Sequence, residues 1–422
     1  MEQHSNISIE QLALQRDRYR HLSDEEWRWF LQQVEGRERT ADKLPTFAAI
    51  DDWWYPVRLS CEQCSSELTA RYKAQIVLGT WSNGTCLDLT GGYGVDTFFL
   101  SELFAHTDYV EQNAELCRIA AHNFALAHKN ISVHNTSAEA FLSSPLHGGI
   151  EGGFHLIFLD PARRDSHGGK VFRLADCTPN VVELLPSLLS HLAPDGRTLL
   201  KLSPMLDITQ AIKELQTPSD LSGEKIIWDV YIVAVKNEVK EVLLMSRNTE
   251  LSRYRYTDLS NYRDTEPTIT AIDLSKKEQA FTFTREEERE AISLPLQGEL
   301  EGAFLYEPNA AILKAGAYKL VAARFGLQKL DPNTHLYTSD TLVEHFPGRV
   351  WRIKEAPFQL SPKGARDKQA NVLTRNYPLT PEQLKKKLHL RDGGTAYVIA
   401  CRVAGKPTVF LAERVEDIHS ES

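Results

Sequence analysis

The stretch from Cys86 to Asp96 constrains the fold of this chain more than any other. An apolar run of strand type ends in an acid, then comes a glycine-rich turn, Thr90-Gly91-Gly92-Tyr93-Gly94, and an amphipathic helix is predicted over Thr97–Phe104. Glycine lets a backbone approach a ligand closely and adopt positive φ. This order of elements is how an α/β sheet opens a cofactor site at the carboxyl ends of its strands.

Two further predicted strands end in acidic groups. Asp108–Glu111 closes on a glutamate that is suited to binding ribose hydroxyls, and Phe154–Asp160 closes on an aspartate that is followed by Pro161. Because the carboxyl ends of parallel strands meet at one edge of a sheet, we expect these acids and the glycine turn to form one site.

These residues resemble the motifs of class I S-adenosylmethionine-dependent methyltransferases over roughly residues 60–250. The first motif is similar to the run from Asp88 to Gly94, the acid of the second strand matches Glu111, and a third position matches Ser137-Ala138-Glu139. The resemblance implies a Rossmann-like α/β sheet, mostly parallel with the last strand antiparallel, and S-adenosylmethionine as cofactor. The cofactor-binding residues that we expect are Asp88, Thr90, Gly91, Gly92, Gly94, Asp96, Glu111, Gln112, Ser137, Ala138, Asp160 and Pro161.

Two departures from related motifs bear on the reaction. Asp160-Pro161-Ala162-Arg163 stands where many nucleic-acid methyltransferases carry Asp/Asn-Pro-Pro-aromatic, so Ala162 replaces a proline and Arg163 replaces a ring that often stacks on a target base. The motif alone therefore does not assign methylation of a base nitrogen.

The rival cofactor is a dinucleotide. Gly92-x-Gly94 followed by Glu111 loosely imitates that fingerprint, but Thr97 stands where the third glycine is needed. Asp88 before the turn also suits a charged methionine amine better than a pyrophosphate. Simpler interpretations stay open: the glycines as a plain strand-to-helix turn, Asp96 as a helix cap, and Glu111 as a surface acid.

Composition excludes several classes of protein. The 422 residues, 42 % hydrophobic and 9 % aromatic, fit two or three globular domains. No apolar run reaches membrane-spanning length, and the polar N-terminus lacks the layout of a signal peptide. Six cysteines in so long a chain favour a reducing cytoplasm over a disulfide framework. Cys61-x-x-Cys64 is a single pair, so no metal is expected.

The chain divides into four predicted regions. Residues 1–58 are predicted to form helices, including Ile9–Arg20 and Asp24–Val34, with a capping box at Ser23 and a packing cluster of aromatic residues at 53–55. The methyltransferase domain spans residues 59–250, begins with a helix over Cys61–Leu78 and ends in a β-hairpin around residues 236–240. A ferredoxin-like α+β region, residues 251–325, and a THUMP-like domain, residues 326–422, follow.

The last two assignments rest on resemblance to an uncharacterised group of bacterial methyltransferases. Glu307–Gly316 and residues 330–340 carry this resemblance. Pro308 is predicted to open a helix within the first of these segments. THUMP domains accompany RNA-modifying enzymes, so the resemblance implies RNA as partner. The net charge of −9 argues against a general nucleic-acid coat. Residues 341–392, however, hold eleven Lys/Arg against five Asp/Glu. The candidates for phosphate contact are Lys363, Arg366, Lys368, Arg375, Lys385, Lys386 and Lys387, and the alternative, favoured for any single one of them, is a solvated surface.

Methyl transfer is an in-line displacement, so the enzyme mainly positions its reactants. We expect Asp160 to accept a hydrogen bond from an amine or hydroxyl target, and Arg163 and Arg164 to orient an anionic part of the substrate. Lys201 ends the following strand on the same edge and is a further catalytic candidate. Ser203 stands near the position where RNA carbon-5 pyrimidine methyltransferases carry a nucleophilic cysteine, which disfavours that covalent mechanism.

The sequence thus predicts a methyltransferase that acts on tRNA or rRNA, at a base nitrogen or a related site. A small-molecule or protein methyltransferase, and a cofactor-binding protein without turnover, are the alternatives. The sequence leaves the oligomeric state undetermined.

Overall fold

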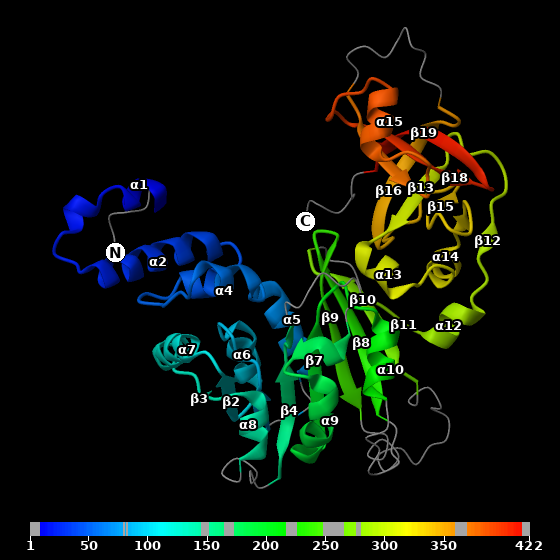
Figure 1. Ribbon diagram of the computed structural model, residues 1–422. Helices are drawn as coiled ribbons and strands as arrows, with labels where there is room; N and C mark the ends of the chain where they lie inside the picture. The colour runs from blue at the N-terminus through cyan, green and yellow to red at the C-terminus, as the bar shows by residue number, and fades with distance from the viewer. Residues whose placement is uncertain are drawn as a thin grey trace. The chain divides into compact units, whose positions relative to one another are not determined.

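The computed structural model describes residues 9–78, 81, 83–144, 152–163, 173–216, 226–247, 266–275, 280–358 and 369–415. The chain forms two compact units, and the division between them falls inside a β-hairpin. The first unit contains residues 1–229 and 242–265, and the second contains residues 230–241 and 266–422. Figure 1 colours the elements in chain order.

Helices precede the large sheet: α1 (Ile9–Ala13), a 3-10 turn (Arg16–Tyr19), α2 (Asp24–Thr40), α3 (Pro45–Ala48), α4 (Arg58–Gln63) and α5 (Glu67–Val77). The predicted capping box starts α2, because Ser23 Oγ accepts from the Glu26 amide at 3.2 Å and Glu26 Oε2 accepts from the Ser23 amide at 2.7 Å. Two predicted helices differ. The helix expected over Ile9–Arg20 is broken into α1 and the 3-10 turn, and the one over Cys61–Leu78 is interrupted at Cys64–Ser66.

The large sheet has the strand order β11-β10-β8-β9-β7-β4-β1-β2-β3. Strands β3, β2, β1, β4 and β7 run parallel, and β9 is antiparallel to β7. This confirms the expected mostly parallel sheet with an antiparallel last strand. The bounds are β1 Thr85–Asp88, β2 His106–Glu111, β3 Ile131–Asn135, β4 Phe154–Leu159, β7 Leu192–Leu202, β8 Ile227–Val235, β9 Glu238–Arg247, β10 Thr268–Asp273 and β11 Phe281–Thr284.

A helix follows each of the first parallel strands, which returns the chain to the start of the next strand and leaves every carboxyl end at one edge of the sheet. These connecting helices are α6 (Val95–Leu100), α7 (Ala114–Leu126) and α8 (Ala138–Ser143), and α9 (Val181–Ser190) and α10 (Ile208–Leu215) continue the unit. A two-stranded ribbon of β5 (Ala162–Arg163) and β6 (Cys177–Thr178) lies just beyond β4 in sequence.

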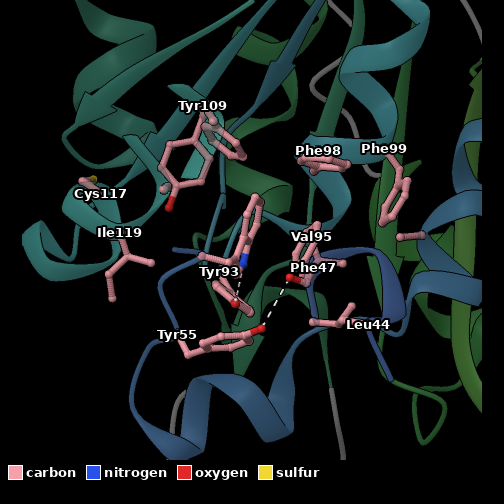
Figure 2. Packing of buried hydrophobic residues seen from close by; sticks show 14 residues of the cluster. Leu44, Phe47, Tyr55, Tyr93, Val95, Phe98, Phe99, Tyr109, Cys117 and Ile119 are labelled. Carbon is pink, nitrogen blue, oxygen red and sulfur yellow. Dashed lines mark hydrogen bonds between the residues drawn. The ribbon is translucent and has the colours of Figure 1, made fainter. Parts of the chain in front are cut away.

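The N-terminal helices share a hydrophobic core with the sheet. The cluster joins residues 44–55 to the glycine turn, α6 and α7 (Figure 2). Trp53 is buried and its Nε1 donates to the Tyr93 hydroxyl at 2.9 Å. Phe47 packs against Trp53 with ring centroids 4.2 Å apart. The aromatic cluster thus has the packing role that the sequence predicted, and it packs the N-terminal region onto the glycine turn.

The β8–β9 hairpin turns on Lys236 and Asn237, whose φ values of 53° and 60° are those of a type I′ turn. Strand β10 pairs in parallel with β8, from Ile269 opposite Val230 onward, and β11 pairs antiparallel with β10. Both strands lie within the predicted C-terminal α+β region, residues 251–325, whereas the structure places them in the large sheet. Local alternation identifies a strand, whereas the choice of sheet depends on its pairing partner.

The second unit contains another sheet, in the order β12-β14-β15-β13-β16-β19-β18-β17. Its strands are β12 Leu294–Pro295, β13 Phe304–Pro308, β14 Gln328–Lys329, β15 Tyr337–Ser339, β16 Gly348–Glu355, β17 Asn371–Arg375, β18 Ala396–Val403 and β19 Lys406–Arg414. The helices of this unit are α12 Arg285–Glu290, α13 Ala310–Ala315, α14 Leu320–Phe325 and α15 Pro381–Lys387.

One prediction in this unit is wrong in detail, and one predicted contact residue has a partner within the protein. Pro308 is the last residue of β13 and does not open α13, which is capped by Asn309 through a 3.0 Å bond from the Ile312 amide to Asn309 Oδ1. Arg375 was a candidate for phosphate contact, yet its Nε donates to the buried carboxylate of Glu307 at 2.5 Å. The predicted phosphate contacts Lys363, Arg366 and Lys368 lie outside the described residues.

Candidate functional site

A pocket of about 330 Å³ opens beside the carboxyl ends of β1, β2 and β4 in the first unit. It contains the glycine turn and most of the residues that the sequence marked. Those predicted residues are Asp88, Thr90, Gly91, Gly92, Gly94, Asp96, Glu111, Gln112, Ser137, Ala138, Asp160 and Lys201.

Close packing around the turn requires glycine at two of its positions. A Cβ on Gly91 would lie 2.1 Å from the ring of Tyr109, which is fully buried. Gly94 has a φ of 82°, and a Cβ there would lie 2.7 Å from Phe124. The Tyr109 hydroxyl donates to the Gly92 carbonyl at 2.5 Å. The turn therefore packs directly onto β2 and α7 and presents its backbone to the pocket.

Asp88 ends β1 at the base of the pocket with its carboxyl buried. Its Oδ2 accepts from Thr97 Oγ1 at 2.5 Å and its Oδ1 accepts from the Thr90 amide at 2.9 Å. Burial raises the pKa of Asp88 to about 7, against the opposing effect of these hydrogen bonds. A carboxyl in this state can ionise near neutral pH when a cation arrives beside it.

Glu111 ends β2 and is held at the rim by backbone amides. Its Oε2 accepts from the Gly92 amide at 3.0 Å and its Oε1 accepts from the Asn113 amide at 2.8 Å. These bonds fix the carboxylate beside the glycine turn with acceptor capacity to spare, since an ionised carboxylate has about four lone-pair sites. Glu111 is thus integrated into the pocket wall and is not a detached surface acid.

Four charged side chains of alternating sign form a chain from the protein interior to the pocket. Lys73 on α5 is completely buried, and its Nζ lies 3.1 Å from Asp96 Oδ1. Lys201 Nζ lies 3.7 Å from Asp96 Oδ2 and contacts the carboxylate of Asp160. We call these four residues the charge chain. Its exposed fraction rises along the series, from 0 % for Lys73 through 10 % for Asp96 and 13 % for Lys201 to 39 % for Asp160.

The structure excludes the helix cap, one of the two roles that the sequence suggested for Asp96. Gly94 is the cap position of α6 and no side chain caps it, so Asp96 is not the cap. Its Oδ2 accepts from Ser65 Oγ at 2.7 Å. Burial alone would raise the pKa of Asp96, but the Lys73 and Lys201 ammonium groups and the Ser65 bond hold it below its usual value. Asp96 is therefore an anion that connects α5 to the pocket.

The interruption between α4 and α5 supplies pocket residues that sequence reasoning missed. Ser66 caps α5, with its Oγ accepting from the Thr69 amide at 3.2 Å. The break directs Ser65 toward Asp96, and the other missed lining residues near it are Ser60, Gln63 and Cys64. Two features of the sequence could have revealed this break and its pocket residues. Ser65-Ser66-Glu67 is a typical helix start, and Lys73 lies within the apolar stripe of the predicted helix. Thr136, Thr178 and Pro179 were also missed.

The remaining predicted residues lie elsewhere or are not described. Pro161 follows Asp160 but does not line the pocket. Arg163 is described only by its backbone, which pairs with Cys177 in the β5–β6 ribbon, and Arg164 lies outside the described residues. Lys385, Lys386 and Lys387 form the last turn of α15 in the second unit.

The residues of the pocket fit the cofactor that the sequence implied. The glycines leave a cradle that a Cβ would fill, as the contacts at Gly91 and Gly94 show. Asp88 offers a carboxyl for an ammonium, and Glu111 offers acceptors for hydroxyls. Within the described residues no group of three His, Cys, Asp or Glu side chains is arranged to hold a metal ion, and no helix there is long and apolar enough to cross a membrane. The fold and this pocket define a class I S-adenosylmethionine-dependent methyltransferase.

Comparison with known proteins identifies the family. A candidate methyltransferase from Porphyromonas gingivalis W83, solved by crystallography, is 32 % identical, with a TM-score of 0.76, and the match covers 94 % of this chain and 92 % of that one. An uncharacterised S-adenosylmethionine-dependent methyltransferase of Mycobacterium tuberculosis H37Rv is 23 % identical over 388 residues, which cover 89 % of this chain and 92 % of the relative.

Two domain families also match the second unit. A ferredoxin-like domain family matches residues 304–347, and a THUMP-like domain family matches residues 348–414. The chain therefore belongs to the family of S-adenosylmethionine-dependent methyltransferases that carry these C-terminal domains, and its cofactor is S-adenosylmethionine. The domain boundaries expected from the sequence stay predictions.

Proposed function

We propose that this methyltransferase acts on RNA of the tRNA or rRNA type and transfers the methyl group directly, without a covalent enzyme–substrate intermediate. The observation that carries the proposal is the THUMP-like match over residues 348–414, because THUMP domains accompany RNA-modifying enzymes. The basic end of α15 lies within that range and adds a second, independent reason.

The basic turn of α15 is arranged to meet phosphates. Lys386 and Lys387 are exposed, whereas Lys385 is partly buried and pairs with Asp392. A groove beside them is lined by Glu382, Gln383, Lys385, Lys386, His389 and Leu390. Lysines at such a surface give binding that is largely independent of base sequence, which suits a domain that presents RNA to a catalytic domain.

S-adenosylmethionine, when bound, supplies an electrophilic methyl group on a sulfonium. On our proposal Asp88, Glu111 and the turn from Thr90 to Gly94 bind the cofactor, with Asp96, Gln112, Ser137 and Ala138 as further candidates. Asp160 and Lys201 lie where the acceptor is expected, and Arg163 and Arg164 remain proposed substrate contacts. The chief work of these residues is to hold the acceptor in line with the methyl group.

A cysteine nucleophile is disfavoured on two grounds. Ser203 follows β7, where the covalent enzymes carry their cysteine. Cys64 lines the pocket, but burial raises its thiol pKa, against the opposing influence of Lys43, and its Sγ donates to the Cys61 carbonyl at 3.2 Å. A buried thiol that stays protonated is a poor nucleophile.

The test uses the full-length chain with S-adenosylmethionine that is labelled in the methyl group. Its substrates are total RNA from a strain that lacks the gene, a protein extract and a small-molecule extract. We expect label in RNA that ribonuclease releases as nucleosides, and no RNA label from an Asp160→Ala variant that still binds cofactor. Label in protein or small molecules alone would favour the alternative, a methyltransferase that acts on proteins or small molecules. Cofactor binding without any transfer would favour a binding protein.

A further inference from the structure

The charge chain indicates which kind of atom on the substrate accepts the methyl group. Its outer members, Lys201 and Asp160, both line the pocket. Lys201 lies in β7, and Asp160 directly follows the adjacent parallel strand β4. Asp160 is fixed by its own backbone, because its amide donates to Thr90 Oγ1 at 2.6 Å. The pocket wall next to the glycine turn thus presents an ammonium and a carboxylate side by side.

A cation at this place discriminates between kinds of acceptor. A ring nitrogen attacks with its lone pair and becomes positively charged, and an exocyclic amine does the same before it loses a proton. A fixed ammonium opposes both charges as they develop. A hydroxyl has the opposite requirement, because it must lose a proton and its oxygen becomes negative. An ammonium or a proton-accepting amine favours that step.

We propose, building on the proposed action on RNA, that the acceptor is a hydroxyl oxygen, the ribose 2′-hydroxyl, and that Lys201 accepts its proton. The 2′-hydroxyl is the hydroxyl that RNA displays at each nucleotide. Lys201 first releases to solvent the proton that it carries in its pairs with Asp96 and Asp160, a step that higher pH favours. The O–H bond then breaks and its proton passes to the neutral amine of Lys201. The oxygen then forms a bond to the methyl carbon as the sulfur–methyl bond breaks, which yields a methyl ether, a neutral thioether and an ammonium that releases its proton to solvent.

The inner members of the charge chain are positioning residues in this scheme. Lys73 has no access to the pocket, since its side chain is entirely buried. Together with Ser65 it holds Asp96, and Asp96 Oδ2 in turn lies 3.7 Å from Lys201 Nζ, which also contacts Asp160. Lys201 therefore sits between two carboxylates that fix its nitrogen at one point of the pocket wall.

The surroundings of Lys201 make the proposal testable by pH. The charged and titratable groups that face it or its contacts include Asp160 after β4, Asp96 from α6, Lys73 from α5, Asp88 from β1 and the Cys64 thiol. Buried Glu241 on β9 lies two residues from Leu243, the residue paired with Lys201. Removing the Asp160 carboxylate removes a stabilising charge from the ammonium, so Lys201 should lose its proton at a lower pH.

The first experiment identifies the product. RNA methylated by the full-length enzyme with deuterium-labelled S-adenosylmethionine is digested to nucleosides and analysed by mass spectrometry. We expect the label on ribose, with an unlabelled base fragment. Label on a base would overturn this inference and leave the action on RNA intact. Label in no nucleoside, with transfer to another class of substrate, would overturn both.

The second experiment tests Lys201. The wild-type rate should rise tenfold per pH unit below the midpoint of its pH–rate profile. Lys201→Arg should lose roughly 10²–10⁴-fold in kcat with cofactor affinity retained. Asp160→Asn should shift the midpoint of the profile to lower pH. The matched control is Lys129→Arg, because Lys129 is similarly buried, at 17 % exposure, and pairs with Glu102 at 2.8 Å away from the pocket. A flat wild-type profile, or near-normal turnover of Lys201→Arg, would overturn the assignment of the base.

Discussion

The ammonium of Lys73 lies 3.1 Å from the carboxylate of Asp96, and the lysine side chain is inaccessible to solvent. A buried pair of this kind costs much to break, because the remaining charge is left in a poorly solvating interior. Lys73→Met should lower the free energy of unfolding by about 3–5 kcal/mol. Urea denaturation of the purified full-length chain measures it.

The double variant Lys73→Met/Asp96→Asn should recover part of that loss, since it leaves no uncompensated anion beside the methionine. Strictly additive losses would show that the two residues do not interact. Lys129→Met is the matched control. Its partner Glu102 is 44 % exposed, so the pair should contribute no more than about 1 kcal/mol.

The buried carboxyl of Asp88 should make stability depend on pH. Burial raises its pKa from 3.8 to about 7. The folded chain thus keeps a proton that the unfolded chain releases between these values. The contribution of this bound proton to the free energy of unfolding is complete below the ordinary pKa of Asp88 and is lost as pH rises through the raised pKa. The stability of Asp88→Asn relative to wild type should therefore increase by about 1.4 kcal/mol per pH unit from pH 4 to 7. Parallel stability curves for the two proteins would contradict the raised pKa.

Two neighbouring glycines should respond differently to alanine. Gly92 has room for a Cβ, whose nearest neighbour would be the Thr90 carbonyl at 3.8 Å, but its φ is 54°. Gly92→Ala should cost about 1–2 kcal/mol from the left-handed backbone alone. Gly91→Ala should cost more, because its Cβ would overlap the buried Tyr109 ring. Thermal unfolding of both variants ranks them, and the reverse order would mean that the turn is not packed on β2 as described.

Glu111 should contribute to cofactor affinity. Glu111→Gln removes the negative charge at the rim while it keeps the size of the side chain, and binding of S-adenosylmethionine should weaken by about 1–3 kcal/mol. Calorimetry measures this directly. Glu115→Gln is the control, since Glu115 lies in the first turn of α7, pairs with exposed Arg118 and does not line the pocket. Equal effects of the two substitutions would remove Glu111 from the binding site.

The exposed lysines of α15 should contribute to RNA affinity through charge. Lys386→Glu/Lys387→Glu should weaken RNA binding similarly across sequences, and the slope of log affinity against log salt should fall by about one per lysine. Cofactor affinity should not change. An unaltered salt slope in filter-binding or anisotropy titrations would mean that phosphates are contacted elsewhere.

The sequence by itself determined the sheet, the cofactor and most of the pocket. These features are local: an acid at the end of an apolar run, a glycine turn and a following helix are read within about ten residues, and parallel strands carry their carboxyl ends to one edge. Asp88, Glu111 and Asp160 therefore converge as expected, although they are distant in the chain.

The tertiary structure alone decided which charges meet. The sequence predicted one continuous helix around Lys73 and gave no partner for its charge. Only the interruption that ends at Ser66 and the packing of α5 beside α6 bring Lys73 to Asp96. The placement of β10 in the large sheet was likewise fixed by its ladder with β8. Local propensity and periodicity fix the type of an element, whereas its partners are chosen by contacts between residues far apart in sequence, and the charge chain consists of such contacts.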